Sequence, residues 1–226
     1  MLYSREKYTE QCKLHLFDGK GTYEKISQTK AEVLQNLLQR IKTLIQQTKI
    51  QHPVLQRLAY TIKTWAEYAV KGNLLCKFYI IWKLHKKANL RGVQSRHISS
   101  NIGYATAQLS HFLHCQLEEA VFTHKHVLKD SLSLIREIEG WKLNEEDNLY
   151  LLSADVAALY PSIDIDRGIV AVQLFMKEHT NIPLSLQELY LSFARFVLEN
   201  NYLECENLEE GGIFLQKIGT AMGTSF

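Results

Sequence analysis

The sequence predicts an α+β fold, with helices toward the N-terminus and a small antiparallel sheet built mainly from later residues. Two kinds of pattern indicate this: stretches in which apolar residues recur every three or four positions, and short runs rich in aromatic and β-branched residues. The composition is that of a globular protein, since 46% of the 226 residues are hydrophobic and 22% are charged. With only three prolines and no Gly/Ser-rich run, no flexible linker is expected.

The first third of the chain carries the helical pattern most clearly. Apolar residues recur at helical spacing over 29–50 and again over 54–70, so we predict two helices separated at His52-Pro53. Residues 1–16 are expected to form a shorter amphipathic helix, and the glycines of 17–22 a turn. We interpret this region as scaffold and partner surface rather than as the place of chemistry.

A basic two-stranded ribbon is predicted next. Residues 76–83 are rich in aromatic and β-branched residues, and 93–99 can return beside them after a polar turn. Between Tyr68 and Leu117 the chain has no acidic residue and seven basic ones: Lys71, Lys77, Lys83, Lys86, Lys87, Arg91 and Arg96. A segment this one-sided attracts phosphate. The alternative is a solvated basic hairpin without a ligand.

The remaining elements follow from the same patterns. Helices are predicted over 104–122, 128–138, 167–178 and 185–199, with Asp166 and Ser185 as N-caps of the last two. A hairpin with arms 202–205 and 212–216 closes the predicted set. Five glutamates near this hairpin would repel a nucleic-acid backbone and are expected on an outer face: Glu199, Glu204, Glu206, Glu209 and Glu210.

Histidines and a cysteine gather near the helix over 104–122, but their spacing does not indicate a metal site strongly. Zinc binding is one interpretation of this group, and satisfied or exposed histidines are the simpler one: His111, His114, Cys115, His124 and His126. The four cysteines include no Cys-x-x-Cys pair and are expected to be buried free thiols in a reducing compartment.

One carboxylate stands out because it follows a run that suits a buried strand. Residues 149–152 are apolar, Asp155 comes soon after them, and Pro161 is expected to stop regular structure. A carboxylate at the mouth of a buried strand needs a cationic partner, and a divalent ion such as magnesium is one candidate. The alternative is a capping residue at a junction between strand and turn.

Three motifs, in this order along the chain, resemble those of reverse transcriptases. The ribbon sequences Phe78-Tyr-Ile-Ile-Trp-Lys-Leu-His-Lys86 and Ser95-Arg-His-Ile-Ser-Ser100 are similar to the lysine-bearing and arginine-bearing strands of the fingers. Asp155-Val-Ala-Ala-Leu-Tyr160 resembles the first catalytic motif, and Gly219-Thr-Ala-Met-Gly-Thr224 resembles the glycine-rich template-grip motif. The tripeptides Leu-His-Lys and Ala-Met-Gly within these motifs are most similar to those of the Penelope-like retroelement enzymes. Their leader region is also similar to this chain at Tyr8, Asp18 and Thr22-Tyr23-Glu24.

The resemblance implies a right-hand polymerase that synthesises DNA on an RNA template. A helical region over 1–73 would precede the fingers at 74–148 and a partial palm at 149–226. Two magnesium ions would serve nucleotidyl transfer, with Asp155 and the backbone carbonyl of Val156 as ligands. The expected partners are an RNA template, a DNA primer and a deoxynucleoside triphosphate.

The same resemblance implies the contacts of individual residues. Tyr160 would lie under the sugar of the incoming nucleotide and exclude a 2′-hydroxyl. The remaining nucleotide contacts would come from Lys83, Lys86, Arg96, Ala158 and Leu159. The template and primer would contact Gly219, Met222, Gly223 and Thr224.

The chain departs from the family pattern at several points. Trp82 and His97 stand where the Penelope-like pattern usually has proline, and Met222 stands where many reverse transcriptases have glutamine. No Tyr-x-Asp-Asp motif is present before Phe226. We therefore expect either the front portion of a longer enzyme or a truncated element, inactive by itself in both cases.

Two other interpretations remain open at this point. One is a catalytically inactive, polymerase-derived module that binds RNA through the basic segment. The other is a structural helical protein with chance matches, in which Arg96, Asp155 and Gly223 would lie far apart. With no apolar run of transmembrane length and no signal-peptide pattern, we expect an intracellular protein, nuclear or cytoplasmic, that does not contact a membrane.

Overall fold

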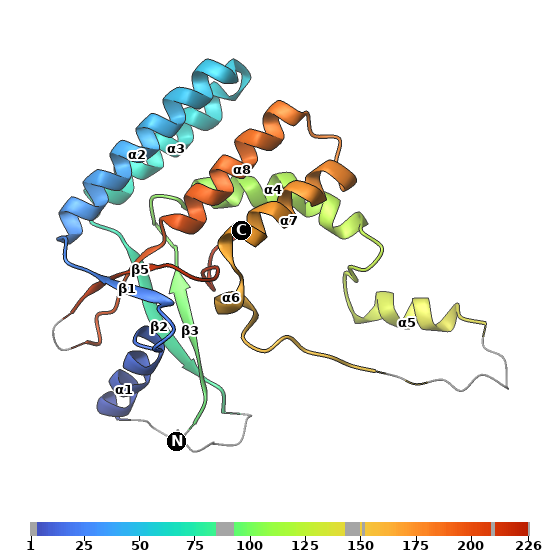
Figure 1. Cartoon of the computed structure of the whole chain (residues 1–226), viewed down its shortest axis with the longest axis horizontal. Coiled ribbons are helices and arrows are strands. Elements are labelled where there is room, and N and C mark those ends of the chain that lie inside the picture. The colour runs from blue at the N-terminus through green and yellow to red at the C-terminus, as the bar shows by residue number, and fades with distance from the viewer. Residues whose placement is uncertain (1–3, 85–92, 143–149, 151, 209–210, 226) are drawn as a thin grey trace.

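The structure, a computed structural model, describes residues 4–84, 93–142, 150, 152–208 and 211–225. It confirms the α+β class, with 56% of residues in helices and one five-stranded mixed sheet. Figure 1 shows a layer of long helices above the sheet and a short helix below it. None of the helices in these ranges combines the length and apolar character needed to cross a membrane. The elements are α1 (Arg5–Leu16), β1 (Tyr23–Ile26), α2 (Lys30–Gln51), η1 (Pro53–Leu55), α3 (Gln56–Lys71), β2 (Cys76–Trp82), β3 (Ser95–Ser100), α4 (Ala107–Thr123), α5 (Ser131–Glu139), α6 (Leu159–Ser162), α7 (Ile165–His179), α8 (Leu184–Glu199), β4 (Tyr202–Glu204) and β5 (Ile213–Gln216).

The sheet draws strands from distant parts of the chain. Its order is β1-β5-β4-β2-β3, and β2 pairs with β4 in parallel while all other pairs are antiparallel. The expectation of a wholly antiparallel sheet is therefore wrong. The sequence patterns did not predict β1, because four residues are too few to show an alternation and its partner β5 lies at the other end of the chain. All three predicted segments contribute strands to this one sheet.

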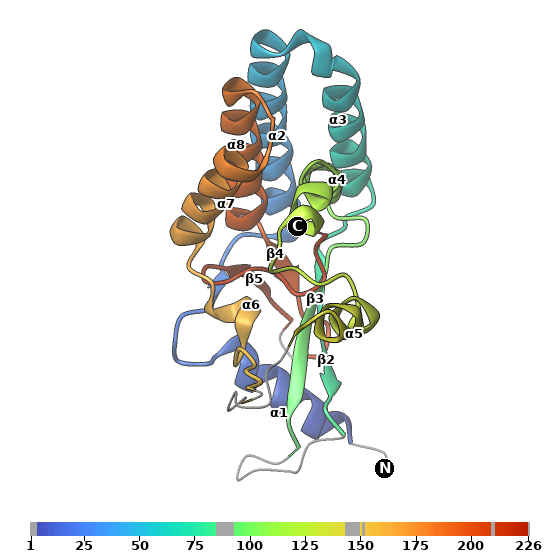
Figure 2. The same ribbon diagram turned by 90° about the vertical axis from the view of Figure 1, so that its right-hand side faces the viewer.

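The two long N-terminal helices form as predicted and pack side by side (Figures 1 and 2). The side chain of Thr29 accepts a hydrogen bond from the backbone N–H of Glu32, and the Glu32 carboxylate accepts one from the N–H of Thr29. This capping box satisfies donors that the first turn leaves free. The predicted apolar stripe of α2 is buried at Val33, Leu37, Ile41 and Ile45.

A buried tyrosine joins the helical layer to the sheet. Tyr104 is only 1% exposed; its hydroxyl donates to the backbone carbonyl of Asn200, between α8 and β4. The indole Nε1 of Trp65 in α3 donates to the carbonyl of Tyr104 at 3.0 Å. These bonds satisfy polar groups in the core while fixing the start of α4 against α3 and α8.

The apolar run over 149–152 was expected to form a buried strand ahead of Asp155, but its described residues do not form a strand. Tyr150 and Leu152 are 86% and 90% exposed and belong to no strand, while residues 149 and 151 lie outside the described part. Apolar composition alone cannot say whether a sheet has a free position next to the run, and none of the described strands includes Tyr150 or Leu152.

Three further local predictions are corrected. Pro161 does not stop regular structure but lies within the single turn of α6, which is too short to require the N–H that proline lacks. Asp164, not Asp166, caps α7, because its carboxylate accepts from the N–H of Arg167 at 2.8 Å. Ser185 does not cap α8, which begins at Leu184 after a proline.

The cysteines are free, as expected, but not all are buried. Cys12, Cys76 and Cys205 are buried, whereas Cys115 is exposed on α4. The outward position of Cys115 follows from its place on the helix, one residue past the histidine His114 and on the side opposite the buried Leu113 and Leu117.

Candidate nucleic-acid interface

The glycine-rich loop at 219–224 is held against the turn that follows Asp155. The backbone N–H of Gly219 donates to the carbonyl of Ile163 at 2.9 Å, and the N–H of Thr220 donates to the carbonyl of Tyr160 at 2.8 Å. Gly219 has a φ of +81°, and a Cβ on it would lie 2.4 Å from the Tyr160 carbonyl oxygen. Only glycine allows so close an approach between these two backbone segments.

The other end of the same loop is held against the basic ribbon. The backbone N–H of Ser99 in β3 donates to the carbonyl of Met222 at 2.9 Å. Gly223 has a φ of +126°, and a Cβ on it would lie 2.7 Å from the carbonyl oxygen of Ser99. The loop therefore bridges α6 and β3, which brings the three sequence motifs together at one place.

Arg96 lies on the face of β3 that the loop approaches. Side chains alternate along a strand, and β3 buries Ser95, His97 and Ser99 while Arg96 is exposed. Ile98 shares the face of Arg96, and a Cβ on Gly223 would lie 3.4 Å from its Cγ2 atom. Gly223 thus approaches the face of β3 that carries Arg96.

The segment that carries Asp155 is open to solvent. Asp155 is exposed, Val156 is 63% exposed, and the side chain of Tyr160 is 45% exposed. Tyr160 is therefore not a core tyrosine, which was the alternative to a sugar contact. Ala158 has a φ of +51°, a left-handed conformation that is strained for a residue with a Cβ, and Leu159 follows it at the start of α6. Strained backbone of this kind is concentrated at functional sites.

Of the two lysines predicted to contact the nucleotide, the structure describes only Lys83. Lys86 lies outside the described residues. Lys83 continues the ladder beyond β2, its N–H donating to the carbonyl of Gln94 at 2.8 Å. Burial is the main cause that lowers the pKa of both His15 and His97, and the charge of Lys83 acts in the same direction.

The basic segment and the cluster of glutamates meet rather than lying on separate faces. Lys77 forms an ion pair with Glu206 at 3.1 Å, and Lys30 forms one with Glu204. The side chain of Glu204 is only 19% exposed, so it does not lie on an outer face as predicted. Glu209 and Glu210 lie outside the described residues.

The acidic residues present fit part of a magnesium site. Magnesium in nucleotide sites is held by one or two carboxylates together with phosphate oxygens and water, and Asp155 with the carbonyl of Val156 can supply protein ligands of this kind. The nearest further carboxylates along the chain have other partners, since Asp164 caps α7 and Asp166 pairs with Arg195 at 2.8 Å. In the part of the chain that the structure describes, no three His, Cys, Asp or Glu side chains form a metal-binding group.

The structure shows a partly buried polar cluster that the sequence did not indicate. His15 of α1 makes a hydrogen bond through Nε2 to the hydroxyl of Ser95 at 2.7 Å, and its Nδ1 lies 3.3 Å from Nδ1 of His97. Burial, the neighbouring His15 and the charge of Lys83 lower the pKa of His97 to about 4. Since 82 residues separate the two histidines, no local pattern could have paired them.

Comparison with protein-family models, with curated proteins and with solved structures gives no match for this chain. The class defined by the fold is an α+β protein with a five-stranded mixed sheet.

Proposed function

We propose that these residues are the fingers and the first part of the palm of an RNA-directed DNA polymerase of the Penelope-like retroelement type. The observation that carries the proposal is the glycine-rich loop, whose two ends contact the turn after Asp155 and the strand that bears Arg96. Three motifs separated along the chain would have no reason to converge if their order were accidental. The loop leaves little space for a side chain at either glycine, as expected where backbone lies close to another strand or a ligand.

Each part of the site has a role in this reaction. Asp155 and the Val156 carbonyl would hold magnesium, which when bound supplies the charge that activates the primer hydroxyl and stabilises the leaving pyrophosphate. Arg96 would bind triphosphate oxygens through its forked guanidinium group and offset the charge that shifts to them. The exposed ring of Tyr160 would block a ribose 2′-hydroxyl by shape, and the backbone at Ala158 and Leu159 would contact phosphate.

The template would lie along the loop. Met222 and Thr224, together with the backbone of Gly219 and Gly223, would contact the templating base. An enzyme with these substrates acts on nucleic acid inside the cell, so we expect a nuclear or cytoplasmic location.

The proposal is tested by equilibrium binding of an RNA template annealed to a DNA primer, measured by fluorescence anisotropy over a range of salt concentrations. Replacing Arg96 with alanine should weaken binding and reduce the slope of log affinity against log salt by about 1, because one phosphate contact is lost. The matched control is Arg57→Ala, an exposed arginine on α3 away from the loop. Equal effects of the two substitutions would contradict the proposal.

A second candidate function is an RNA-binding module without catalysis, since within the described residues no three His, Cys, Asp or Glu side chains gather to hold a metal ion. By themselves these residues are expected to bind nucleic acid without extending a primer. The two candidates differ once the chain is joined to the remaining metal ligands of a polymerase. Magnesium-dependent nucleotide incorporation that Asp155→Ala abolishes would then support the enzyme, and its absence would support the module.

A further inference from the structure

Helix α5 has an apolar face that nothing in the described structure covers. None of its nine residues is buried, and Leu132, Ile135 and Ile138 are 59%, 50% and 40% exposed. These three residues recur at helical spacing and form one stripe. A nine-residue helix is too short to be stable alone in water. Its sequence therefore indicates a partner for this stripe.

A groove of matching character lies near the start of the arm that carries α5. It has a volume of about 470 Å³ and lies between α4 and α7. Its apolar lining is formed by Leu117, Val121 and Phe122 of α4 and by Ala171, Val172 and Phe175 of α7. Val121 and Phe122 are 37% and 49% exposed, so this apolar surface also lacks a partner.

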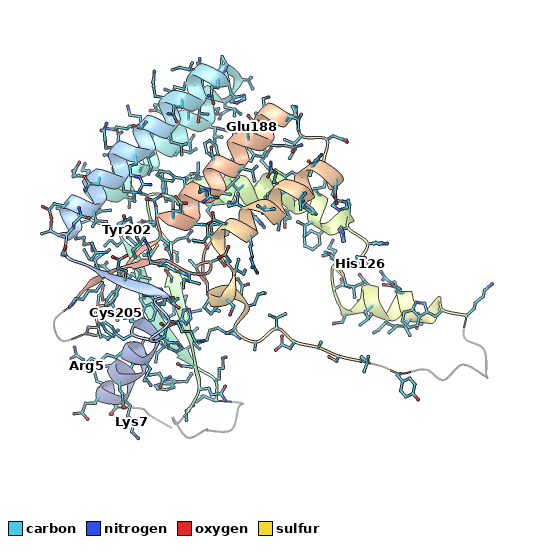
Figure 3. The ribbon with its side chains drawn as sticks, in the orientation of Figure 1. Arg5, Lys7, His126, Glu188, Tyr202 and Cys205 are labelled. Atoms are coloured by element: carbon cyan, nitrogen blue, oxygen red, sulfur yellow. The ribbon has the colours of Figure 1, made fainter. Side chains whose placement is uncertain are left out.

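The connection between α4 and α5 is short, and it contains the histidines His124 and His126. Residues 124–130 join the two helices, a length typical of connections between packed antiparallel helices. The ring of His124 lies 4.8 Å from that of His179 on α7, and Figure 3 shows His126 at the bend where the arm leaves the helical layer. The connection is thus anchored beside the groove and not at a distance from it.

Folding the chain back at Val127 matches the two surfaces residue by residue. Phe122 and Leu132 are each five positions from Val127, so the two apolar residues would lie at a similar level along the antiparallel helices. Glu118 and Arg136 are each nine positions from it, so opposite charges would meet at the rim. Glu118 borders the groove, where one carboxylate oxygen lies 3.5 Å from Nε2 of His114, and Arg136 borders the apolar stripe of α5.

We propose that α5 is a strap that closes onto the α4–α7 groove of its own chain. Closure buries the stripe of α5 and the exposed apolar residues of α4 together, and pairs Glu118 with Arg136. A tether of seven residues keeps the local concentration of α5 high, which favours the groove of the same chain over that of a second copy. The proposal does not depend on polymerase activity.

The closed state is tested by hydrogen exchange of the α5 amides, followed by mass spectrometry on the full chain. Docking should slow their exchange by roughly tenfold or more relative to an undocked helix, which corresponds to about 1.4 kcal/mol. Replacing Val121 with aspartate should remove this protection, because a charge would enter the groove. The matched control is Val54→Asp, at a residue that is 88% exposed and far from the groove along the chain, and it should leave α5 unchanged.

Charge reversal and protein concentration complete the test. Glu118→Arg should reduce the protection of α5, and combining it with Arg136→Glu should restore it. Exchange in the unchanged chain as fast as in an unstructured peptide would overturn the proposal. Protection that rises with protein concentration would also overturn it, since the occupant of the groove would then be a second copy.

Discussion

Gly219 is the residue at which the contact between the loop and α6 can be tested most cleanly. Alanine at this position would place a Cβ 2.4 Å from the Tyr160 carbonyl oxygen, in addition to the strain of a φ of +81°. We expect Gly219→Ala to lower the free energy of unfolding by about 1–3 kcal/mol more than a control with backbone strain alone. Urea denaturation measures this difference.

Gly19 provides that control. It has a φ of +73°, and a Cβ on it would meet no atom within 4 Å, so Gly19→Ala carries the backbone strain without the clash. Equal destabilisation by the two substitutions would mean that the loop can move away from α6 at no cost in free energy. The contact between the loop over 219–224 and α6 would then not be rigid.

Tyr160 makes a separate prediction about substrate choice. Because its side chain is 45% exposed, Tyr160→Val should change the free energy of unfolding little. In a polymerase that joins these residues to the remaining metal ligands, the same change should raise incorporation of ribonucleotides relative to deoxyribonucleotides. The measurement is primer extension with each kind of nucleotide. Unchanged discrimination would remove Tyr160 from the sugar contact.

At the scale of elements, the docking of α1 on the ribbon should depend on pH. The pKa of His97 is lowered to about 4 in the folded protein, against an ordinary value near 6.5, because burial and the neighbouring His15 and Lys83 disfavour its charged form. The charge of Asp18 raises the pKa of His97 and so opposes these effects in part. The unfolded chain therefore binds a proton that the folded chain does not. The contribution of His97 to the free energy of unfolding is therefore fully present above about pH 6.5 and is lost as the pH falls toward 4.

We expect the free energy of unfolding to drop by about 2 kcal/mol from His97 between pH 7 and pH 5. His97→Gln should flatten this dependence, whatever its effect on stability at pH 7. Urea titrations at both values measure the difference between the two proteins. The control is His126→Gln, since His126 lies exposed at the bend after α4, and this change should leave the slope as it is. A slope that His97→Gln does not alter would place the acid sensitivity elsewhere.

The elements that sequence could predict are those with local signals. The apolar stripe of α2, the ribbon of β2 and β3 and the glycines of the loop are readable from spacing and residue type. The strand β1 and the parallel pairing of β2 with β4 are not, because each depends on a partner far along the chain. The prediction of a strand over 149–152 was wrong for the same reason. Apolar residues form a buried strand only where a neighbouring strand of a sheet is free to pair with them.

For the whole molecule, the order of the motifs predicted one cleft bordered by Asp155, Tyr160 and the loop and faced by Arg96, and this cleft stays a prediction. The sequence alone did not reveal that the loop contacts both β3 and α6, because this requires Ser99 and Tyr160 to meet the same six residues. Nor did it reveal that Lys77 is paired with Glu206, or that His15 and His97 lie together. Arg96 shares its face of β3 with Ile98, which Gly223 of the loop approaches.

The central claim, that the loop over 219–224 receives the template, is tested most directly by photo-crosslinking. An RNA template carrying 5-iodouridine at the templating position is annealed to a DNA primer, bound to the protein and irradiated, and the crosslinked peptide is identified by mass spectrometry. The account predicts that the crosslink lies in the peptide that contains Met222, and that excess unlabelled primer–template removes it. A dominant crosslink in the α2–α3 pair, with none in the loop, would contradict the account.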